Sequence, residues 1–410
     1  MKGVVDVPGR ANAVAQWGCR TRICAGEGAL DMVVSGDIPR QQNVLVLGSG
    51  FAAANFRLVD GVRRRLKVPA DRLHLIQAPA TVEQVETLAA LLTRVPADNV
   101  VAIGGTAALD VTKLACHQLA DDRTLAVVRA RGAGRGVITL PFEAPARVRQ
   151  ILVPTTFGSA AELSPHAAVR LRGQQRVVYG GGLPPSLAAI DSGLTKSLAR
   201  QAVLDGLLMS LARFVDPYVD GDGQETMTAV EAQTATSALA SLGLRAQAGD
   251  LSAPDRLLAS YLNVTQVGPA IVGRHPYVSK AWAVTAELIG ILRLRPAAAL
   301  GTVLPSIWRR IDDGDDRFGD RERLRRAWGW IRTSGYGHLP ADPANGVAAL
   351  IRSWGIDSEI VDGHRAARVT GSRAARFWGG NQSPLTGIPA ADLTRLVSDA
   401  LSANAISDGQ

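Results

Sequence analysis

A strand, a glycine pair and a helix start follow one another within residues 100–113, and this stretch constrains the fold most strongly. The segment reads VVAIGGTAALDVTK. Its apolar run ends at Gly104 and Gly105, and a helical pattern that contains Asp110 and Lys113 follows. Such a turn directs free backbone N–H groups and the positive end of a helix dipole toward one point, which suits a phosphate. The sequence therefore predicts a phosphate or nucleotide site at this turn.

The composition is that of a globular protein large enough for two domains. The chain has 410 residues, of which 47% are hydrophobic and 20% charged. No apolar run reaches the roughly 18 residues that a membrane span needs. The N-terminal stretch has no long apolar core of the kind found in a secretory signal. The three cysteines are too few and too scattered for a disulfide framework or a zinc cage. We therefore expect a cytoplasmic protein that does not enter a membrane.

The net charge of +8 comes almost entirely from arginine. Two explanations stay open, namely a GC-rich genome that favours arginine codons and an anionic macromolecular partner. The arginines are dispersed and are not interleaved with aromatic residues, so we expect no nucleic-acid binding.

Strands alternate with helices in the first half of the chain. Apolar runs typical of strands lie at 44–47, 73–76, 100–103 and 150–153, and helical patterns lie at 59–66, 82–92 and 107–119. Residues 121–150, rich in Arg, Gly and Pro, are expected to form hairpin or loop structure. The alternation predicts a parallel sheet with helices on both faces.

The second half of the chain has helical patterns and no clear strand. The helical windows are 194–215, 225–242, 254–264, 279–292, 300–311, 321–333, 345–353 and 390–401. The sequence therefore predicts an α/β nucleotide-binding domain over residues 1–190 and an all-α domain over residues 191–410.

A second glycine turn lies at residues 48–53, reading GSGFAA. It fits the G-x-G-x-x-A dinucleotide fingerprint, with Asp71 about twenty residues further on. Chance matches are common in Gly- and Ala-rich chains, and Asp71 comes before a strand rather than at its end. The stretch is either a fingerprint or a strand-to-helix turn that borders a cofactor, and Ser49 is a candidate cofactor-binding residue.

Four further stretches follow the first glycine turn in a fixed order. They are PTTFGSAAE at 154–162, LAAIDS at 187–192, the Asp-Gly-Leu of a helix at 205–207, and NQSPLT at 381–386. In this order, together with GGTAALDVTK at 104–113, they resemble motifs of the iron-containing alcohol dehydrogenases, within the dehydroquinate-synthase-like superfamily. The resemblance covers nearly the whole chain.

The resemblance implies that NAD or NADP, together with substrate, binds in a cleft between a nucleotide domain and a helical domain. Where the family has a carboxylate for the ribose hydroxyls, this chain has Gly48 and Ser49, so NADP is open as well as NAD. The hydroxyls of the PTT stretch follow a strand's carboxyl end, where ligands bind in open α/β sheets; the alternative is local hydrogen bonding within a turn. The candidate cofactor-binding residues are Ser49, Gly104, Gly105, Thr106, Asp110, Thr155, Thr156 and Ser159.

The resembled family binds a divalent metal through one Asp and three His of the helical domain. Asp205 matches the Asp, but Met209 stands where the first His is expected, and Trp282 and Pro296 stand near the other two positions. These side chains do not replace imidazoles around a hard or borderline cation. The sequence therefore predicts that the metal site is lost and that no metal is bound.

Three functions are compatible with this pattern. The first is a metal-independent NAD(P) oxidoreductase acting on a secondary alcohol, with Asp205 and His275 as candidate general bases. For Asp205 the alternative is a charge near a helix N-terminus, and for His275 it is a surface turn residue. The second is a catalytically inactive binding or scaffold subunit of a partner enzyme. The third, the least favoured, is an elimination or cyclisation on a sugar phosphate.

The substrate is expected to be a small molecule or a peptide. One divergent group of the family, the daptide-type peptide-tailoring dehydrogenases of natural-product pathways, acts on a C-terminal Thr. Oxidation of that β-hydroxy acid gives a β-keto acid that loses CO₂ readily. The many arginines could attract the peptide's carboxylate. A partner protein is possible, and we expect a homodimer.

Overall fold

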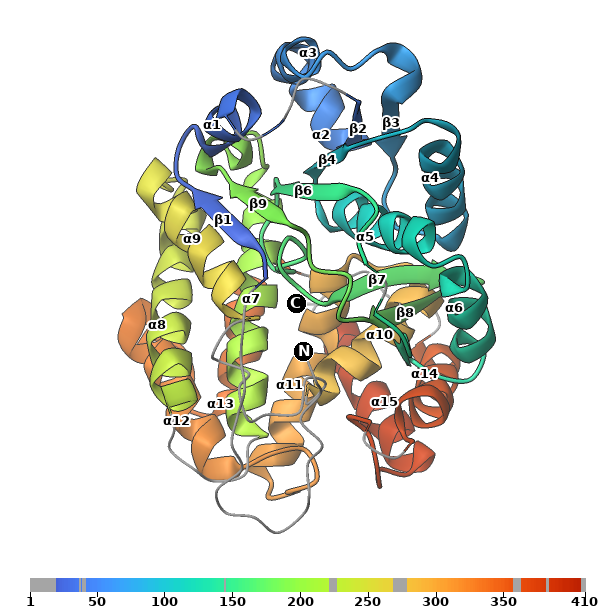
Figure 1. Ribbon diagram of the computed structural model, residues 1–410. Helices are drawn as coiled ribbons and strands as arrows, with labels where there is room; N and C mark the ends of the chain where they lie inside the picture. Colours follow the sequence, from blue (N-terminus) through green and yellow to red (C-terminus); the bar gives the residue numbers. More distant parts are fainter. Residues whose placement is uncertain are drawn as a thin grey trace. The chain divides into compact units, whose positions relative to one another are not determined.

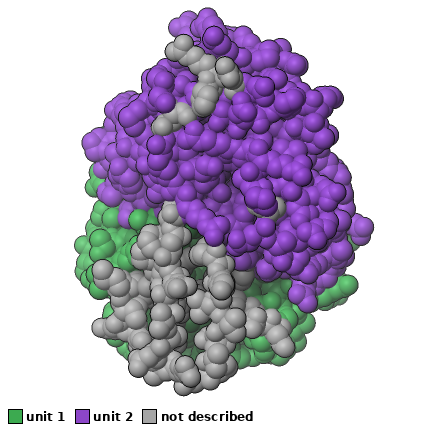
Figure 2. Space-filling view, in the orientation of Figure 1, with its two compact units in different colours: residues 1–18, 200–251, 265–410 green, residues 19–199, 252–264 purple. Residues whose placement is uncertain are grey.

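The computed structural model describes residues 20–36, 38, 42–143, 145–220, 227–267, 279–356, 363–380 and 383–406. The chain divides into two compact units, which Figure 2 shows in different colours. We call residues 19–199 and 252–264 the α/β unit. We call residues 200–251 and 265–410, with residues 1–18, the helical unit.

A six-stranded parallel sheet forms the centre of the α/β unit (Figure 1). In spatial order its strands are β1 (Arg22–Ala25), β9 (Leu187–Ile190), β6 (Arg149–Pro154), β4 (Asn99–Gly104), β2 (Asn43–Gly48) and β3 (Leu73–Ile76). The neighbours β6, β4 and β2 pair in register, so that Gly104 lies opposite Pro154 and Ile103 opposite Leu47. The carboxyl ends of these three central strands therefore meet at one edge of the sheet.

Helices cover both faces of this sheet, as the alternation of strands and helices predicts. Alternate side chains of β2, β4 and β6 pack on α4 (Val82–Arg94) and α5 (Thr106–Ala120) in one apolar core. The intervening side chains form a second core with α1 (Ala29–Gly36) and α3 (Phe56–Arg65). Strands buried on both faces read as continuous apolar runs, which is why the sequence reveals them so clearly.

Local signals explain where α4 begins. Thr81 accepts a hydrogen bond from the Gln84 amide at 3.3 Å, and the Gln84 side chain accepts one from the Thr81 amide at 3.0 Å. This reciprocal capping box satisfies two amide groups that a helix start leaves without partners.

The prediction of hairpin or loop over residues 121–150 is wrong in part, because that stretch contains a helix, α6 (Thr124–Gly132), and a strand, β5 (Val137–Thr139). The hairpin lies further on, where β7 (His166–Leu171) pairs antiparallel with β8 (Gln174–Tyr179) in a second sheet. A buried Arg176, whose Nε donates to the Gly132 carbonyl at 2.9 Å, ties β8 to α6.

The described part of the helical unit contains helices and no strand, as predicted. The helices are α7 (Arg200–Val219), α8 (Met227–Ala248), α10 (Lys280–Leu292), α11 (Pro296–Asp312), α12 (Arg321–Ile331), α13 (Pro343–Ser353), α14 (Gly363–Trp378) and α15 (Ala390–Ile406). A π-helical turn, Arg332–Tyr336, continues α12. No sequence window indicated α14. The helix over 254–264, by contrast, is present as α9 (Ala253–Thr265), and residues 253–264 belong to the α/β unit. No helix among the described residues is long and apolar enough to cross a membrane.

Candidate functional site

The glycine turn between β4 and α5 is built on close contact between two strand ends. A β-carbon added to Gly104 would lie 2.9 Å from the Gly48 nitrogen and 2.9 Å from the Ala108 β-carbon. A β-carbon on Gly105 would lie 3.2 Å from the Thr156 methyl group. Contacts this short exclude a side chain at Gly104, which is buried. The next residues, Gly105 to Ala107, are partly exposed, so their backbone can be approached by a phosphate.

The first turn of α5 has amide groups available to a ligand. Gly105 is the N-cap in an extended conformation and supplies no side-chain cap. Its carbonyl accepts from the Ala108 amide at 3.0 Å and from the Leu109 amide at 3.4 Å. Among the described residues, the amides of Thr106 and Ala107 have no internal partner. These two donors and the helix dipole form a positive end suited to an anion.

The hydroxyl-bearing loop after β6 lies against this turn. The Thr155 amide donates to the Gly104 carbonyl at 3.0 Å, and Thr156 is the neighbour of Gly105. Ser159 lies further along the loop, where its Oγ accepts from the Ala161 amide at 3.3 Å, a local turn contact. The structure therefore brings Gly104, Gly105, Thr155 and Thr156 together, and Ser49 is adjacent because it follows Gly48.

Asp110 is buried and already paired. Its Oδ2 accepts from the Ala168 amide at 2.8 Å, and its Oδ1 lies 2.9 Å from Nζ of Lys113. Lys113 also donates to the carbonyls of Ser164 and His166. Both side chains are buried, and their contacts join α5 to the start of β7. The motif's Asp and Lys therefore stabilise the helix that follows the turn.

An unpredicted pair of residues holds the same loop from its other end. Asn263 of α9 accepts from the Gly158 amide at 2.7 Å and donates to Oε1 of Glu162 at 2.9 Å. Burial raises the pKa of Glu162 to about 7, and its Oε2 has no hydrogen-bond partner among the residues that the structure describes. Ala160, which lies between Gly158 and Glu162 in the chain, has a φ of +51°, a conformation that glycine adopts more easily. The PTTFGSAAE motif points to Glu162, whereas nothing in the sequence pairs Asn263 with it.

In the helical unit, Asp205 lies on α7 with a cation beside it. Its Oδ2 forms an ion pair with a guanidinium nitrogen of Arg295, and its Oδ1 accepts from Nε2 of Gln201 at 3.0 Å. The other candidate base, His275, lies outside the described residues.

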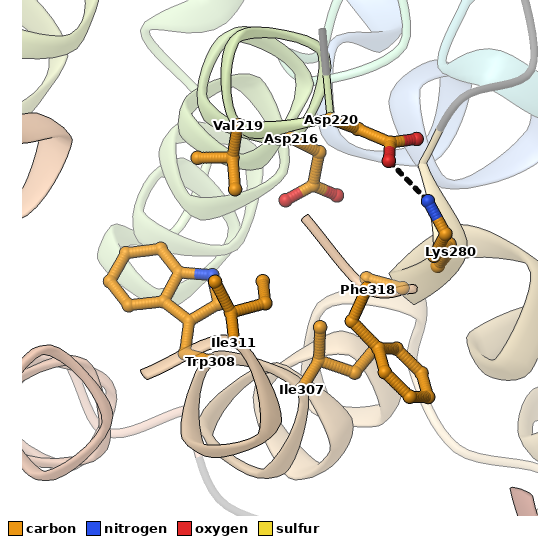
Figure 3. A pocket seen from close by; sticks show the side chains of 9 residues that line it. Asp216, Val219, Asp220, Lys280, Ile307, Trp308, Ile311 and Phe318 are labelled. Atoms are coloured by element: carbon orange, nitrogen blue, oxygen red, sulfur yellow. Dashed lines mark hydrogen bonds and ion pairs between the residues drawn. The ribbon is translucent and has the colours of Figure 1, made fainter. Parts of the chain in front are cut away.

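A small cavity lies next to the same helix (Figure 3). Asp216, Asp220 and Lys280 are among its lining residues, and Lys280 is ion-paired with Asp220. Burial raises the pKa of Asp216 to about 7. The cavity volume of about 10 Å³ leaves room for roughly one water molecule. It is too small for a substrate.

Comparison with known proteins identifies this architecture. Residues 20–192 match the family model described as iron-containing alcohol dehydrogenase. The E. coli K-12 protein YqhD has a TM-score of 0.78 at 16% identity, over 94% of this chain and 98% of YqhD. The NADH-dependent butanol dehydrogenase A of Thermotoga maritima has a TM-score of 0.76 at 14% identity, over 94% and 98%. The chain has the iron-containing alcohol dehydrogenase fold.

The sequence relatives match the chain only in part. A phosphonoacetaldehyde reductase of Streptomyces viridochromogenes is 33% identical over 187 residues, which are 44% of this chain and 46% of the reductase. The chain thus spans less than half the length of the curated relatives it matches. The family match likewise ends at residue 192, before the segment with the metal-ligand positions.

The residues around Asp205 do not fit the metal that the name of this fold implies. One helical turn beyond Asp205 is Met209, a thioether rather than an imidazole. Arg213 lies two turns beyond Asp205, and its guanidinium carbon is 4.7 Å from the ring centroid of Trp282. The position beside Asp205 is taken by Arg295, a cation that disfavours a second one. No group of three His, Cys, Asp or Glu within the described ranges could hold a metal ion.

Proposed function

We propose that this protein is an NAD(P)-dependent oxidoreductase that interconverts an alcohol and a carbonyl compound. The observation that carries the proposal is the glycine turn. Gly104 lets β4 end against Gly48, the Thr106 and Ala107 amides have no internal partner among the described residues, and Thr155 and Thr156 lie beside the turn. These residues would hold the cofactor's pyrophosphate. A bound nicotinamide supplies a hydride to a carbonyl carbon or accepts one from an alcohol carbon.

Both NAD and NADP are compatible with the end of β2. Strand β2 ends at Gly48, and Ser49 follows. Neither residue carries a carboxylate that would favour ribose hydroxyls over a 2′-phosphate.

We propose that the reaction proceeds without a metal. The support is the residue set around Asp205, in which the soft thioether of Met209 stands where an imidazole is expected and the positive charge of Arg295 lies beside the carboxylate.

For the substrate we propose an alcohol or carbonyl compound that also carries an anionic group. The related phosphonoacetaldehyde reductase is named for an aldehyde of this kind. The daptide-type resemblance suggests a peptide ending in Thr as a second substrate. Such a peptide also belongs to this class, because its C-terminal carboxylate is attached to the carbon next to the hydroxyl-bearing carbon. The net charge of +8 favours either substrate over a cationic one.

The test is a panel assay with the purified protein. Small aldehydes bearing phosphonate, sulfonate or carboxylate groups are incubated with NADH or NADPH, and cofactor oxidation is followed by absorbance. Thr-ending peptides are incubated with NAD or NADP and analysed by mass, where oxidation and decarboxylation remove CO₂ plus two hydrogens. Turnover of one substrate supports the proposal. If the protein neither turns over a substrate nor binds a cofactor, the result would instead support a scaffold subunit. That function is consistent with the replacement of glycine or serine in the resembled motifs by Thr106, Ala107, Ala160 and Ala161.

A further inference from the structure

Three ionisable side chains lie together inside the α/β unit, close to the glycine turn. Asp110 and Lys113 lie on α5, one and two helical turns after Thr106, and Glu162 ends the PTTFGSAAE stretch. All three residues are buried, with at most 3% of their surface exposed. Nζ of Lys113 is 2.9 Å from Oδ1 of Asp110, and its charge also acts on Glu162. One ammonium group therefore serves two carboxyl groups.

The net charge of this cluster depends on the proton of Glu162. Burial raises the pKa of Glu162 to about 7; Asn263 and Lys113 favour its ionised form, and the Asp110 carboxylate disfavours it. Asp110 and Lys113 form an ion pair. The three side chains therefore carry no net charge while Glu162 is protonated, and they carry a single negative charge once it is ionised.

The neighbouring elements supply the other groups near this cluster. Helix α9 contributes Asn263, which is uncharged and donates to Oε1 of Glu162 at 2.9 Å. Strand β7 begins with His166, whose carbonyl accepts from Lys113 and whose Nδ1 lies 2.9 Å from Oγ of Ser164. An imidazole ordinarily titrates in the same pH range, so an experiment has to separate His166 from Glu162.

An ionised Glu162 acts against an anion at the glycine turn. The amides of Thr106 and Ala107, which have no internal partner among the described residues, begin the same helix that holds Asp110 and Lys113. The residues from Thr106 to Lys113 span about 10 Å of helix. Unit charges at about this distance in a protein interior change a binding constant roughly tenfold, and burial limits screening by salt. An anion should therefore bind more tightly while Glu162 holds its proton.

The same carboxyl group is also connected to the PTT loop. Oδ1 of Asn263 accepts from the Gly158 amide at 2.7 Å, while its Nδ2 donates to Oε1 of Glu162. The Asn263 side chain cannot turn over without losing these bonds, because its oxygen only accepts and its nitrogen only donates. Thr155 and Thr156, which lie beside the glycine turn, precede Gly158 in this loop. A change of charge at Glu162 therefore acts on the loop that carries the two hydroxyl groups.

We propose that Glu162 is a positioning residue of the cofactor site and that its carboxylate takes up a proton when the cofactor's pyrophosphate binds. This inference rests on the proposed function. The proton comes from water, and no covalent bond of the cofactor changes. Because the neutral acid favours the bound anion, cofactor affinity falls as pH rises through the pKa of Glu162, about 7.

The experiment compares the wild type with Glu162→Gln in the full-length protein from about pH 6 to about pH 8.5. Glutamine keeps the size of the protonated acid and does not titrate. Dissociation constants are measured for NADH, NADPH and ADP-ribose, which has the diphosphate and lacks the nicotinamide. The wild-type Kd is divided by the variant's Kd, because this ratio cancels any titration of the ligand itself. We expect the ratio to rise about five- to tenfold across this range.

Two control variants test whether another group causes the pH dependence. Asp216→Asn removes a carboxyl group of the helical unit whose pKa burial also raises to about 7. His166→Gln removes the imidazole next to Ser164. Both variants should keep the wild-type pH dependence of Kd, and circular dichroism at each pH verifies that every variant is folded. A pH dependence that is lost in His166→Gln and kept in Glu162→Gln would overturn the inference.

Proton uptake can be measured directly by titration calorimetry. Ligand binding at about pH 7 is followed in two buffers of different ionisation enthalpy, which gives the number of protons taken up. A tenfold linkage raises the pKa of Glu162 by about one unit from about 7, so the wild type should take up about 0.4 proton per ligand more than Glu162→Gln. No uptake by the wild type, or equal uptake by both proteins, would contradict the inference, and the first result needs no variant.

The choice of ligands separates the two levels of the proposal. If NADH or NADPH binds and the ratio of Kd values stays constant with pH, the inference is wrong and the proposed function stands. If ADP-ribose shows the expected dependence but neither nicotinamide cofactor binds, the proton linkage holds and the proposed function fails. If none of the three ligands binds, both fail.

Discussion

Gly48 and Gly104 approach each other so closely that the space beside Gly104 is filled by backbone. A β-carbon on Gly104 would lie 2.9 Å from the Gly48 nitrogen and 3.1 Å from the Gly48 α-carbon. Strands β2 and β4 can end side by side because both residues lack a side chain. This contact positions the phosphate-binding turn that the sequence predicts.

Replacing Gly104 by alanine should therefore damage both stability and cofactor binding. We expect Gly104→Ala to lower the free energy of unfolding by about 1–3 kcal/mol, the usual cost of an overpacked site, and to weaken NAD(P)H binding. Gly61→Ala is the matched control. Gly61 lies within α3 with nothing within 4 Å of the added carbon, so the change should stabilise by about 0.5–1 kcal/mol. Urea unfolding and cofactor titration measure both effects; equal behaviour of the two variants would contradict the account.

The buried pair of Asp110 and Lys113 should be far more important than a surface pair. Lys113→Met leaves the Asp110 carboxylate without its cation and removes the donor to two carbonyls. We expect a loss of about 3–5 kcal/mol in the free energy of unfolding. Lys196→Met, which breaks the exposed pair with Glu27, should cost at most about 1 kcal/mol. Comparable costs in urea unfolding would show that the buried pair does not support the turn.

Glu162 makes stability depend on pH. Burial raises its native pKa to about 7, above the usual 4.5, so the native state holds the proton more tightly than the unfolded chain does. The wild type should lose stability as pH rises from about 4.5 through about 7, by about 3 kcal/mol in total. Glu162→Gln removes this titration. The free energy of unfolding of the variant minus that of the wild type should therefore be larger at pH 8 than at pH 4. Thermal unfolding across this range measures the difference, and a constant difference would refute the assignment.

Asn263 should connect α9 to the stability of the PTT loop. Asn263→Ala leaves the Gly158 amide and Oε1 of Glu162 without this partner, at a cost of about 2–4 kcal/mol. A looser loop should also raise the Kd for NAD(P)H by about tenfold, which corresponds to ~1.4 kcal/mol. Ser252→Ala removes the Asp255 amide's acceptor near the other end of α9, at a cost of about 1 kcal/mol. It should leave the Kd unchanged; a parallel change in both variants would mean that α9 acts only through global stability.

The sequence predicted the parts of the molecule that have local signals. The strands of the central sheet are apolar runs buried on both faces, and the glycine turn combines a strand end with a helix start, so both are visible in a short window. The hairpin of β7 and β8 escaped notice because polar residues such as Arg176 are buried in it and obscure the apolar pattern. Helix α6 is short and has no clear apolar face, so its Arg- and Gly-rich stretch resembled a loop.

Contacts between distant residues could not be predicted in this way. Asn263 reaches Glu162 across 101 positions of the sequence, and Arg295 reaches Asp205 across 90. Nothing in the local sequence around any of these four residues indicates its partner. Asp110 is the opposite case. The sequence shows the motif to which it belongs but does not show that its side chain is buried. The motif identified the turn, and the structure shows that Asp110 is buried in α5, where it pairs with Lys113 and the Ala168 amide.

The most direct test of the account is a fluorescence titration of the wild-type protein with NADH and NADPH. The glycine turn, the open amides of α5 and the adjacent threonine hydroxyls predict saturable binding of at least one of the two, at micromolar to millimolar concentration, with weaker binding by Gly104→Ala. No saturable binding of either cofactor up to millimolar concentration would contradict the central claim that this chain is a nicotinamide-dependent oxidoreductase.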